Sequence, residues 1–138
     1  MRSTNHKGFT LLEVMIVIII IGVLASLAMP RFFSTIEYAR GVEAMYAIAT
    51  IRQSMERCYL MRVSFTGPCS DFTTLDVEDP SLTPGSHFTY LIDSADIAYT
   101  ITATRNTING GDGFSTMWLN FDGSAVTRGG TDNFGAVQ

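Results

Sequence analysis

The chain has 138 residues, enough for one modest globular domain besides a single membrane-spanning segment. Its net charge is −4, and no basic stripe with interleaved aromatic residues occurs, which argues against a nucleic-acid-binding surface. The sequence contains no zinc-protease, phosphate-loop or serine-hydrolase motif, so it does not indicate an enzyme.

A long apolar segment follows a short polar leader. The leader, residues 1–8, is basic and ends at Gly8, and residues 9–29 then hold a single charged side chain, Glu13. As a helix, the 21 residues of this segment span about 30 Å, the thickness of the hydrocarbon core of one bilayer. A lone carboxylate in such a segment is unfavourable in lipid unless it finds a partner.

Two simpler interpretations of the apolar segment fit less well. A secretory signal peptide has a shorter apolar core followed by small residues at its cleavage site. Here the glycine precedes the core, and Ala25-Ser26-Leu27-Ala28 is only a weak match to such a site. A plain single-span anchor fits the length but leaves Glu13 without a role.

The order Gly8-Phe9-Thr10-Leu11-Leu12-Glu13-Val14, followed by the apolar run with Gly22 and Pro30, resembles the N-terminus of the type IV pilin family. This family includes the pseudopilins of type II secretion. The resemblance implies that a prepilin peptidase cuts between Gly8 and Phe9 and N-methylates Phe9. It also implies that Glu13 meets the N-terminal amine of a neighbouring subunit during assembly.

The same resemblance implies a location and a set of partners. The chain is expected in the bacterial inner membrane as a single-pass protein with a cytoplasmic N-terminus and a periplasmic head, and later in a periplasmic or cell-surface filament. Its expected partners are the peptidase, an inner-membrane assembly platform and identical or related pilin subunits. The basic leader agrees with this orientation. The alternative is a membrane-anchored periplasmic binding module that never polymerises, which would need neither Glu13 nor the Gly8–Phe9 junction.

Residues 9 to about 61 are predicted to form one long helix. Pro30 removes one internal hydrogen bond and is expected to kink this helix, and Gly22 is a second weak point. Residues 30–62 are the amphipathic half, because their apolar positions recur at three- and four-residue steps. These positions are Ala44, Ile48, Ile51, Met55 and Cys58. They predict a stripe that faces the core.

Glycine and proline pairs mark residues 63–86 as a loop after the helix. In an oxidising compartment, Cys58 and Cys69 are predicted to form a disulfide that stabilises the fold by about 2–3 kcal/mol. A metal or redox pair is the alternative. However, the CxxC spacing is absent, and neither His6 nor His87 is placed to complete a zinc site.

No cofactor is predicted, and calcium is the one alternative. The 63–86 loop is rich in aspartate and glutamate, and major pseudopilins carry a calcium-binding loop near the C-terminus. The acidic residues here lack the spacing of an EF-hand, and the C-terminal part does not match the pseudopilin calcium motif. An acidic surface is therefore the favoured interpretation.

From residue 87 the apolar period changes to two, which predicts strands around 88–92, 97–103, 117–121 and 125–127. Asp122-Gly123 predicts a hairpin turn between the last two. Three or four antiparallel strands after one helix give an α+β fold, in which residues 30–138 form a single head. A long helix on a small antiparallel sheet is also what the pilin resemblance implies.

Two segments within 87–138 are predicted to lie outside the strands. Residues 109–113, which are mostly glycine, are expected to form a flexible connection. Residues 131–135 are expected to be a loosely held tail, with a docking role for their one aromatic side chain as the alternative.

Overall fold

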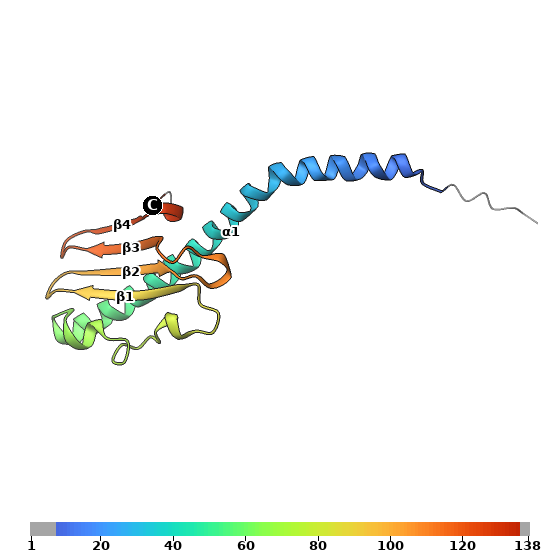
Figure 1. Cartoon of the computed structure of the whole chain (residues 1–138). Helices are drawn as coiled ribbons and strands as arrows, with labels where there is room; N and C mark the ends of the chain where they lie inside the picture. The colour runs from blue at the N-terminus through green and yellow to red at the C-terminus, as the bar shows by residue number, and fades with distance from the viewer. Residues whose placement is uncertain (1–7, 136–138) are drawn as a thin grey trace, which may run out of the picture. The chain divides into compact units, whose positions relative to one another are not determined.

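The computed structural model describes residues 8–135 of the chain, which fall into two compact units. The first unit ends at Thr35 and the second begins at Ile36. One helix, α1 (Leu11–Arg62), contributes to both units, and a four-stranded sheet belongs to the second (Figure 1). The predicted leader, apart from Gly8, lies outside the described residues.

The start of α1 is set by a local capping interaction. The backbone N–H of Glu13 donates a hydrogen bond to the side-chain oxygen of Thr10, with a donor–acceptor distance of 3.2 Å. Thr10-Leu11-Leu12-Glu13 has the Thr-x-x-Glu order of a capping box, which supplies a partner to a backbone donor that the helix leaves free. The helix therefore begins at Leu11, close to the predicted start.

The first unit is an apolar helical segment with exposed side chains. Every position from Gly8 to Thr35 is exposed. By length and composition, α1 contains a window of 18 residues that is apolar enough to cross a membrane. Pro30 lies inside α1 and does not end it, as expected. The kink expected at Pro30 and Gly22 stays a prediction.

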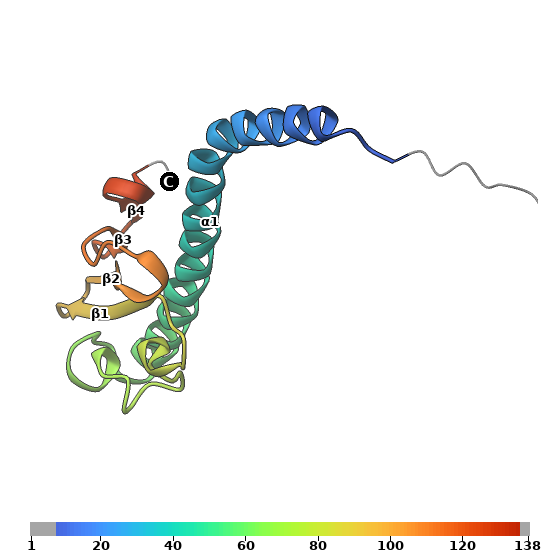
Figure 2. The same cartoon turned by 45° about the vertical axis from the view of Figure 1, so that its right-hand side comes forward.

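The second unit is an α+β head, which confirms the predicted fold class. Its sheet has the order β1 (Phe88–Ser94), β2 (Tyr99–Arg105), β3 (Thr116–Phe121) and β4 (Val126–Gly130), and all neighbouring strands are antiparallel. The part of α1 that belongs to this unit packs against one face of the sheet (Figure 2). The two tight connections, β1–β2 and β3–β4, make the sheet a simple meander.

The core lies between this part of α1 and the inner face of the sheet. Ile101 at the centre of β2 is opposite Ile92 on one side and Leu119 on the other. The predicted helix stripe is confirmed, since Ala44, Ile48, Ile51 and Met55 are all 0% exposed. Complete burial of each large apolar side chain stabilises the fold by about 1.5–3 kcal/mol. The head therefore has a core of its own that does not draw on the first unit.

The C-terminal segment differs from its predicted role. Phe134 is 0% exposed, and its ring centroid is 5.5 Å from that of Phe88. A short 3-10 helix, Asp132–Phe134, turns the ring inward directly after β4. On α1 the ring meets Gly41, where an added Cβ would lie only 3.0 Å from Phe134 Cδ1. The expectation of a loosely held tail was wrong here, because Phe134 fills space that a glycine leaves on the helix.

We expect Phe134→Ala to lower the free energy of unfolding of a fragment that contains only residues 31–138 by about 3–5 kcal/mol, because it leaves a cavity in the core. Urea denaturation followed by circular dichroism measures the change. Phe114→Ala is the matched control, since Phe114 is 62% exposed and its loss should change stability by less than about 0.5 kcal/mol. Equal effects of the two substitutions would show that the tail is not part of the core.

Candidate functional site

The junction between Gly8 and Phe9 precedes the first turn of α1 and is exposed, with Phe9 84% accessible. No atom of the described chain lies within 4 Å of a Cβ built on Gly8. The fold itself therefore makes no steric demand for glycine at this position. Any such demand must come from a molecule that acts on the junction.

Glu13 lies in the first turn of α1, and its carboxylate forms no ion pair within residues 8–135. A carboxylate near a helix N-terminus is favourable by about 0.3–1 kcal/mol. The insertion cost of a charged side chain in a bilayer is larger, about 2.5–3.5 kcal/mol at the centre of a helix. The helix N-terminus alone therefore does not offset the cost of a charge in this apolar segment, and residues 8–135 supply no charged partner for it.

The apolar side chains around Glu13 also lack partners in the described chain. Ile18 to Ile21 are 54–64% exposed, and nothing lies within 4 Å of a Cβ built on Gly22. Within the part of the chain that the structure describes, segment 9–29 therefore presents a continuous exposed apolar surface, which is unfavourable in water.

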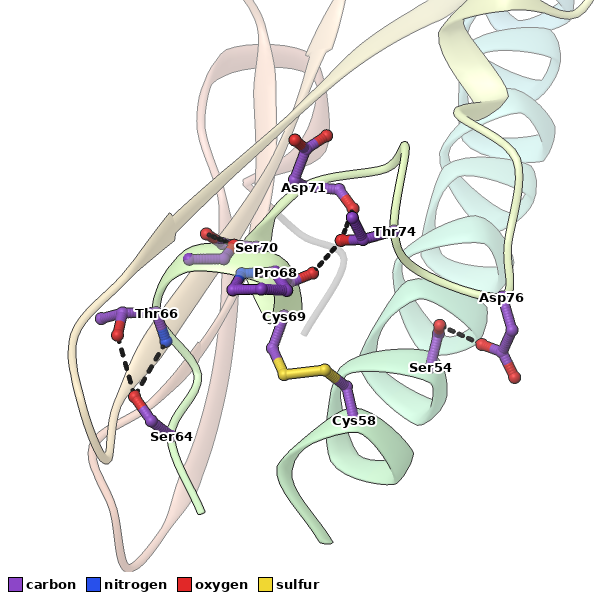
Figure 3. The surroundings of a disulfide bond; sticks show 11 residues. Ser54, Cys58, Ser64, Thr66, Pro68, Cys69, Ser70, Asp71, Thr74 and Asp76 are labelled. Carbon is purple, nitrogen blue, oxygen red and sulfur yellow. Dashed lines mark hydrogen bonds between the residues drawn. A yellow bond between two sulfur atoms is a disulfide. The ribbon is translucent and has the colours of Figure 1, made fainter. Parts of the chain in front are cut away.

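The loop after α1 is stapled to the helix by the Cys58–Cys69 disulfide (Figure 3), whose Cα atoms are 5.6 Å apart. Both residues are buried, Cys69 completely. Cys58 is the last residue of the inward helix stripe, and the short 3-10 helix Gly67–Ser70 returns Cys69 to it. The bond thus holds the start of the loop, which also places Phe65 in the core, against the end of the helix.

A second contact holds the same loop further along. The Asp76 carboxylate accepts a hydrogen bond from Arg57 Nε at 2.8 Å. It also accepts one from the Ser54 hydroxyl (Figure 3). The bonds from Arg57, and then that from Ser54, lower the pKa of Asp76 to about 2. Within residues 8–135, no group of three His, Cys, Asp or Glu side chains is placed to hold a metal ion.

The most buried charged group of the head was not predicted from the sequence. Arg105, the last residue of β2, is 0% exposed, and its Nε donates to Glu37 Oε2 at 3.0 Å. Its remaining N–H groups donate to carbonyl oxygens of His87, Asn106 and Ile108. The guanidinium is therefore fully hydrogen-bonded, as a buried charge must be.

Glu37 also pairs with a second arginine, Arg40, which is half-buried. Its Oε1 lies 2.5 Å from Arg40 Nη1, which also donates to the Asn109 carbonyl at 3.2 Å. Burial by itself raises the pKa of Glu37, but the hydrogen bonds and charge of Arg105, and then those of Arg40, hold it below its ordinary value of 4.5. These contacts fasten the β2–β3 connection to α1 close to where the second unit begins.

The glycines of residues 109–113 predicted a flexible connection between β2 and β3. The structure instead shows several specific contacts that hold this connection. A Cβ at Gly111 would lie 2.5 Å from Arg105 Cζ, so glycine is needed to let the backbone approach the guanidinium. The Asp112 carboxylate accepts bonds from the backbone N–H groups of Phe114 and Ser115 and from the Asn133 side chain. The connection is thereby tied to both α1 and the C-terminal segment.

Comparison with known proteins links the N-terminal segment to a family. The family described as "Prokaryotic N-terminal methylation motif" matches residues 3–29. The chain is 38% identical over 85 residues to the type II secretion system core protein G of Escherichia coli strain K12, covering 61% of this chain and 58% of that protein.

Pilus proteins are also similar to part of the chain. The type IV major fimbrial protein FimA of Dichelobacter nodosus is 41% identical over 55 residues, covering 40% of this chain and 35% of FimA. The type IV narrow pilus major component PilA5 of Thermus thermophilus is 44% identical over 55 residues, covering 33% of this chain and 47% of PilA5. Each alignment spans less than two thirds of the relative's length. No solved structure matches the chain.

We expect Glu37→Gln to lower the free energy of unfolding of fragment 31–138 by about 3 kcal/mol at pH 7, because it leaves the buried Arg105 without its carboxylate. Since the pKa of Glu37 is lowered in the folded state, its contribution is complete above its ordinary pKa of 4.5 and is lost as pH falls through the folded value. The difference between the two proteins should therefore shrink in acid, as measured by urea denaturation at a series of pH values.

Glu43→Gln is the matched control, because it removes an exposed glutamate from the same helix and should change stability by less than about 0.5 kcal/mol. The role given to the Glu37 charge would be contradicted if the difference in free energy of unfolding between Glu37→Gln and the unsubstituted fragment did not change with pH.

Proposed function

Because the chain belongs to the family of type IV pilins and type II secretion pseudopilins, we propose that it is a structural subunit of a pilus-like filament or a secretion pseudopilus. One observation carries the proposal. The apolar segment 9–29 is exposed along its whole length, while the head completes a core without it. A chain of this design is stable only with lipid or other chains around its first unit.

The proposed life of the subunit starts with storage in the inner membrane, with residues 9–29 across the bilayer and the head in the periplasm. A prepilin peptidase removes residues 1–8 and methylates the new N-terminus at Phe9. Exposure of the Gly8–Phe9 junction outside α1 supports access for such an enzyme. The processed chain is then taken from the membrane by an assembly platform.

Assembly then moves the apolar segment from lipid to neighbouring segments of the same kind. Apolar area that left the bilayer for water would cost about 25 cal/mol for each Å². Packing among neighbouring helices avoids this cost, so the filament core replaces the bilayer as the surroundings of residues 9–29. The head needs no rearrangement in this transfer, because its core is separate.

Glu13 gives the packing a register. Cleavage creates an amine at Phe9, and methylation leaves that amine able to carry a proton. A carboxylate and an ammonium group in apolar surroundings attract each other strongly, and only close, hydrogen-bonded contact offsets the cost of removing both charges from water. Because each subunit carries one of each, a pair between neighbours sets their axial offset. In this pair the ammonium group also compensates the carboxylate charge that is unfavourable in apolar surroundings.

We expect Gly8→Val to leave an uncut precursor in the membrane, because a branched side chain replaces the smallest one beside the scissile bond. Mass spectrometry of the unsubstituted protein should find a chain that begins at methylated Phe9. Lys7 is the only lysine of the sequence, so the cut chain keeps one reactive amine and the precursor keeps two. Counting the labels added by an amine-reactive reagent gives an independent readout.

Gly22→Val is the matched control for this experiment. It makes the same change within the apolar segment, at a site where no atom of the described chain is within 4 Å of an added Cβ, and it should be cut normally. Intact Met1 in filaments of the unsubstituted protein would refute processing at Gly8.

We expect Glu13→Val to be inserted and cut normally but to enter filaments poorly, because the partner of the Phe9 amine is lost. Loss of one partner of a buried ion pair costs about 3 kcal/mol, which weakens addition of a subunit roughly a hundredfold. Sheared filament yield relative to membrane-bound protein measures the effect. Glu43→Val, which removes a glutamate from the head part of α1, is the control.

The alternative, an anchored binding module that never polymerises, predicts a different result. Glu13→Val would then leave the amount and the location of the protein unchanged, and the unsubstituted chain would form no filaments. Absence of filaments from the unsubstituted chain would remove the proposed function, whereas a normal filament yield from Glu13→Val would remove only the register role given to Glu13.

A further inference from the structure

The head contains an aromatic pocket beside its core, and the proposed processing and assembly steps do not use it. Its volume is about 490 Å³, within the range of pockets that bind a ligand or a side chain. Seven residues line it: Glu56, Tyr59, Leu60, Phe65, Ile97, Phe121 and Gly123. All of them belong to the second unit, so the pocket is a feature of the head alone.

The walls of the pocket are held in place by stacked rings. Phe65 stacks on Tyr59 with a centroid distance of 4.4 Å and meets Tyr99 edge-on at 4.7 Å and Phe121 at 6.0 Å. The rim is apolar and open, with Leu60 82% and Ile97 58% exposed. A preformed apolar hollow with an exposed apolar rim favours an apolar occupant.

The pocket also has one negatively charged group. Glu56 lines it and pairs through Oε1 with Arg52 at 2.7 Å, and the side chain of Glu56 is 45% exposed. An ionised carboxylate has room for further donors on its second oxygen. The pocket therefore suits an aromatic or aliphatic side chain that has a cation next to it.

The same chain carries such a group in its first unit. Arg31 is exposed and has no ion pair within residues 8–135, and the adjacent Phe32 and Phe33 are 62% and 60% exposed. These three residues come directly after the apolar segment and Pro30. Aromatic and basic side chains at this depth lie at the membrane surface, so in the membrane the lipid covers them. They lose that cover when the subunit leaves the bilayer.

We propose that, in the assembled state, Arg31-Phe32-Phe33 of one copy docks into the pocket of a second copy, with a phenylalanine ring against Phe65 and Phe121 and Arg31 beside Glu56. The inference rests on the proposed function, since it requires assembly. The contact is heterologous, because each copy supplies the segment to one neighbour and the pocket to another, and contacts of this kind extend into open filaments.

Cysteine cross-linking in filaments of the full chain tests this contact. The two native cysteines are joined to each other, so introduced cysteines are the only free thiols. In the double variant Phe33→Cys with Leu60→Cys, a short bis-maleimide should give a ladder of dimers, trimers and longer oligomers on a denaturing gel. Each single variant should give dimers at most. Phe33→Cys with Ile97→Cys, which replaces another residue that lines the pocket, should also give the ladder.

Phe33→Cys with Leu82→Cys is the matched control, because Leu82 is 80% exposed but does not line this pocket, and it should give no ladder. Filaments in which neither pocket pair forms a ladder, or in which the Leu82 pair forms one equally well, would overturn the contact and leave the proposed function intact. Loss of filaments with Leu60→Cys but not with Leu82→Cys would support the contact. Absence of filaments from the unsubstituted chain would instead refute the proposed function.

Discussion

The apolar segment 9–29 has no partner within the described chain, and the other features of the molecule are arranged around that constraint. Its side chains are exposed on every side of the helix, and the single carboxylate among them has no ion pair within residues 8–135. In water such a surface would drive aggregation, so the segment needs lipid or other helices at every stage. A filament subunit meets this need by exchanging one apolar environment for another.

The head is built so that this exchange does not disturb it. Its core closes between α1 and the sheet, and the residues that fix its ends are all internal to the second unit. The disulfide and Asp76 hold the long loop to the end of the helix, while Arg105 and Glu37 hold the β2–β3 connection near its start. In the proposed assembly, a head fixed at both ends moves from membrane to filament without rearrangement, because its core contains no residue of 9–29.

The sequence predicted the parts of the fold that follow a regular period. The three- and four-residue steps from Ala44 to Met55 and the alternation from Tyr99 to Ala103 identified the helix face and the inner face of the sheet. It did not predict Phe134, because that residue comes after the last alternating run and is buried by one short turn. Arg105 takes the next inward position in the alternation of β2, and this was the one feature of the sequence that could have indicated its burial. A charged residue is normally expected at the surface, however. Only the three-dimensional structure shows that Glu37, on α1, pairs with Arg105.

Helical reconstruction by electron cryomicroscopy of filaments made by cells that express this chain would test the central claim most directly. The account predicts that residues 9–29 of all subunits form the filament core, with the Glu13 carboxylate within about 4 Å of the Phe9 amine of a neighbour. A filament held together by heads alone, with residues 9–29 outside the core or Glu13 facing water, would contradict it.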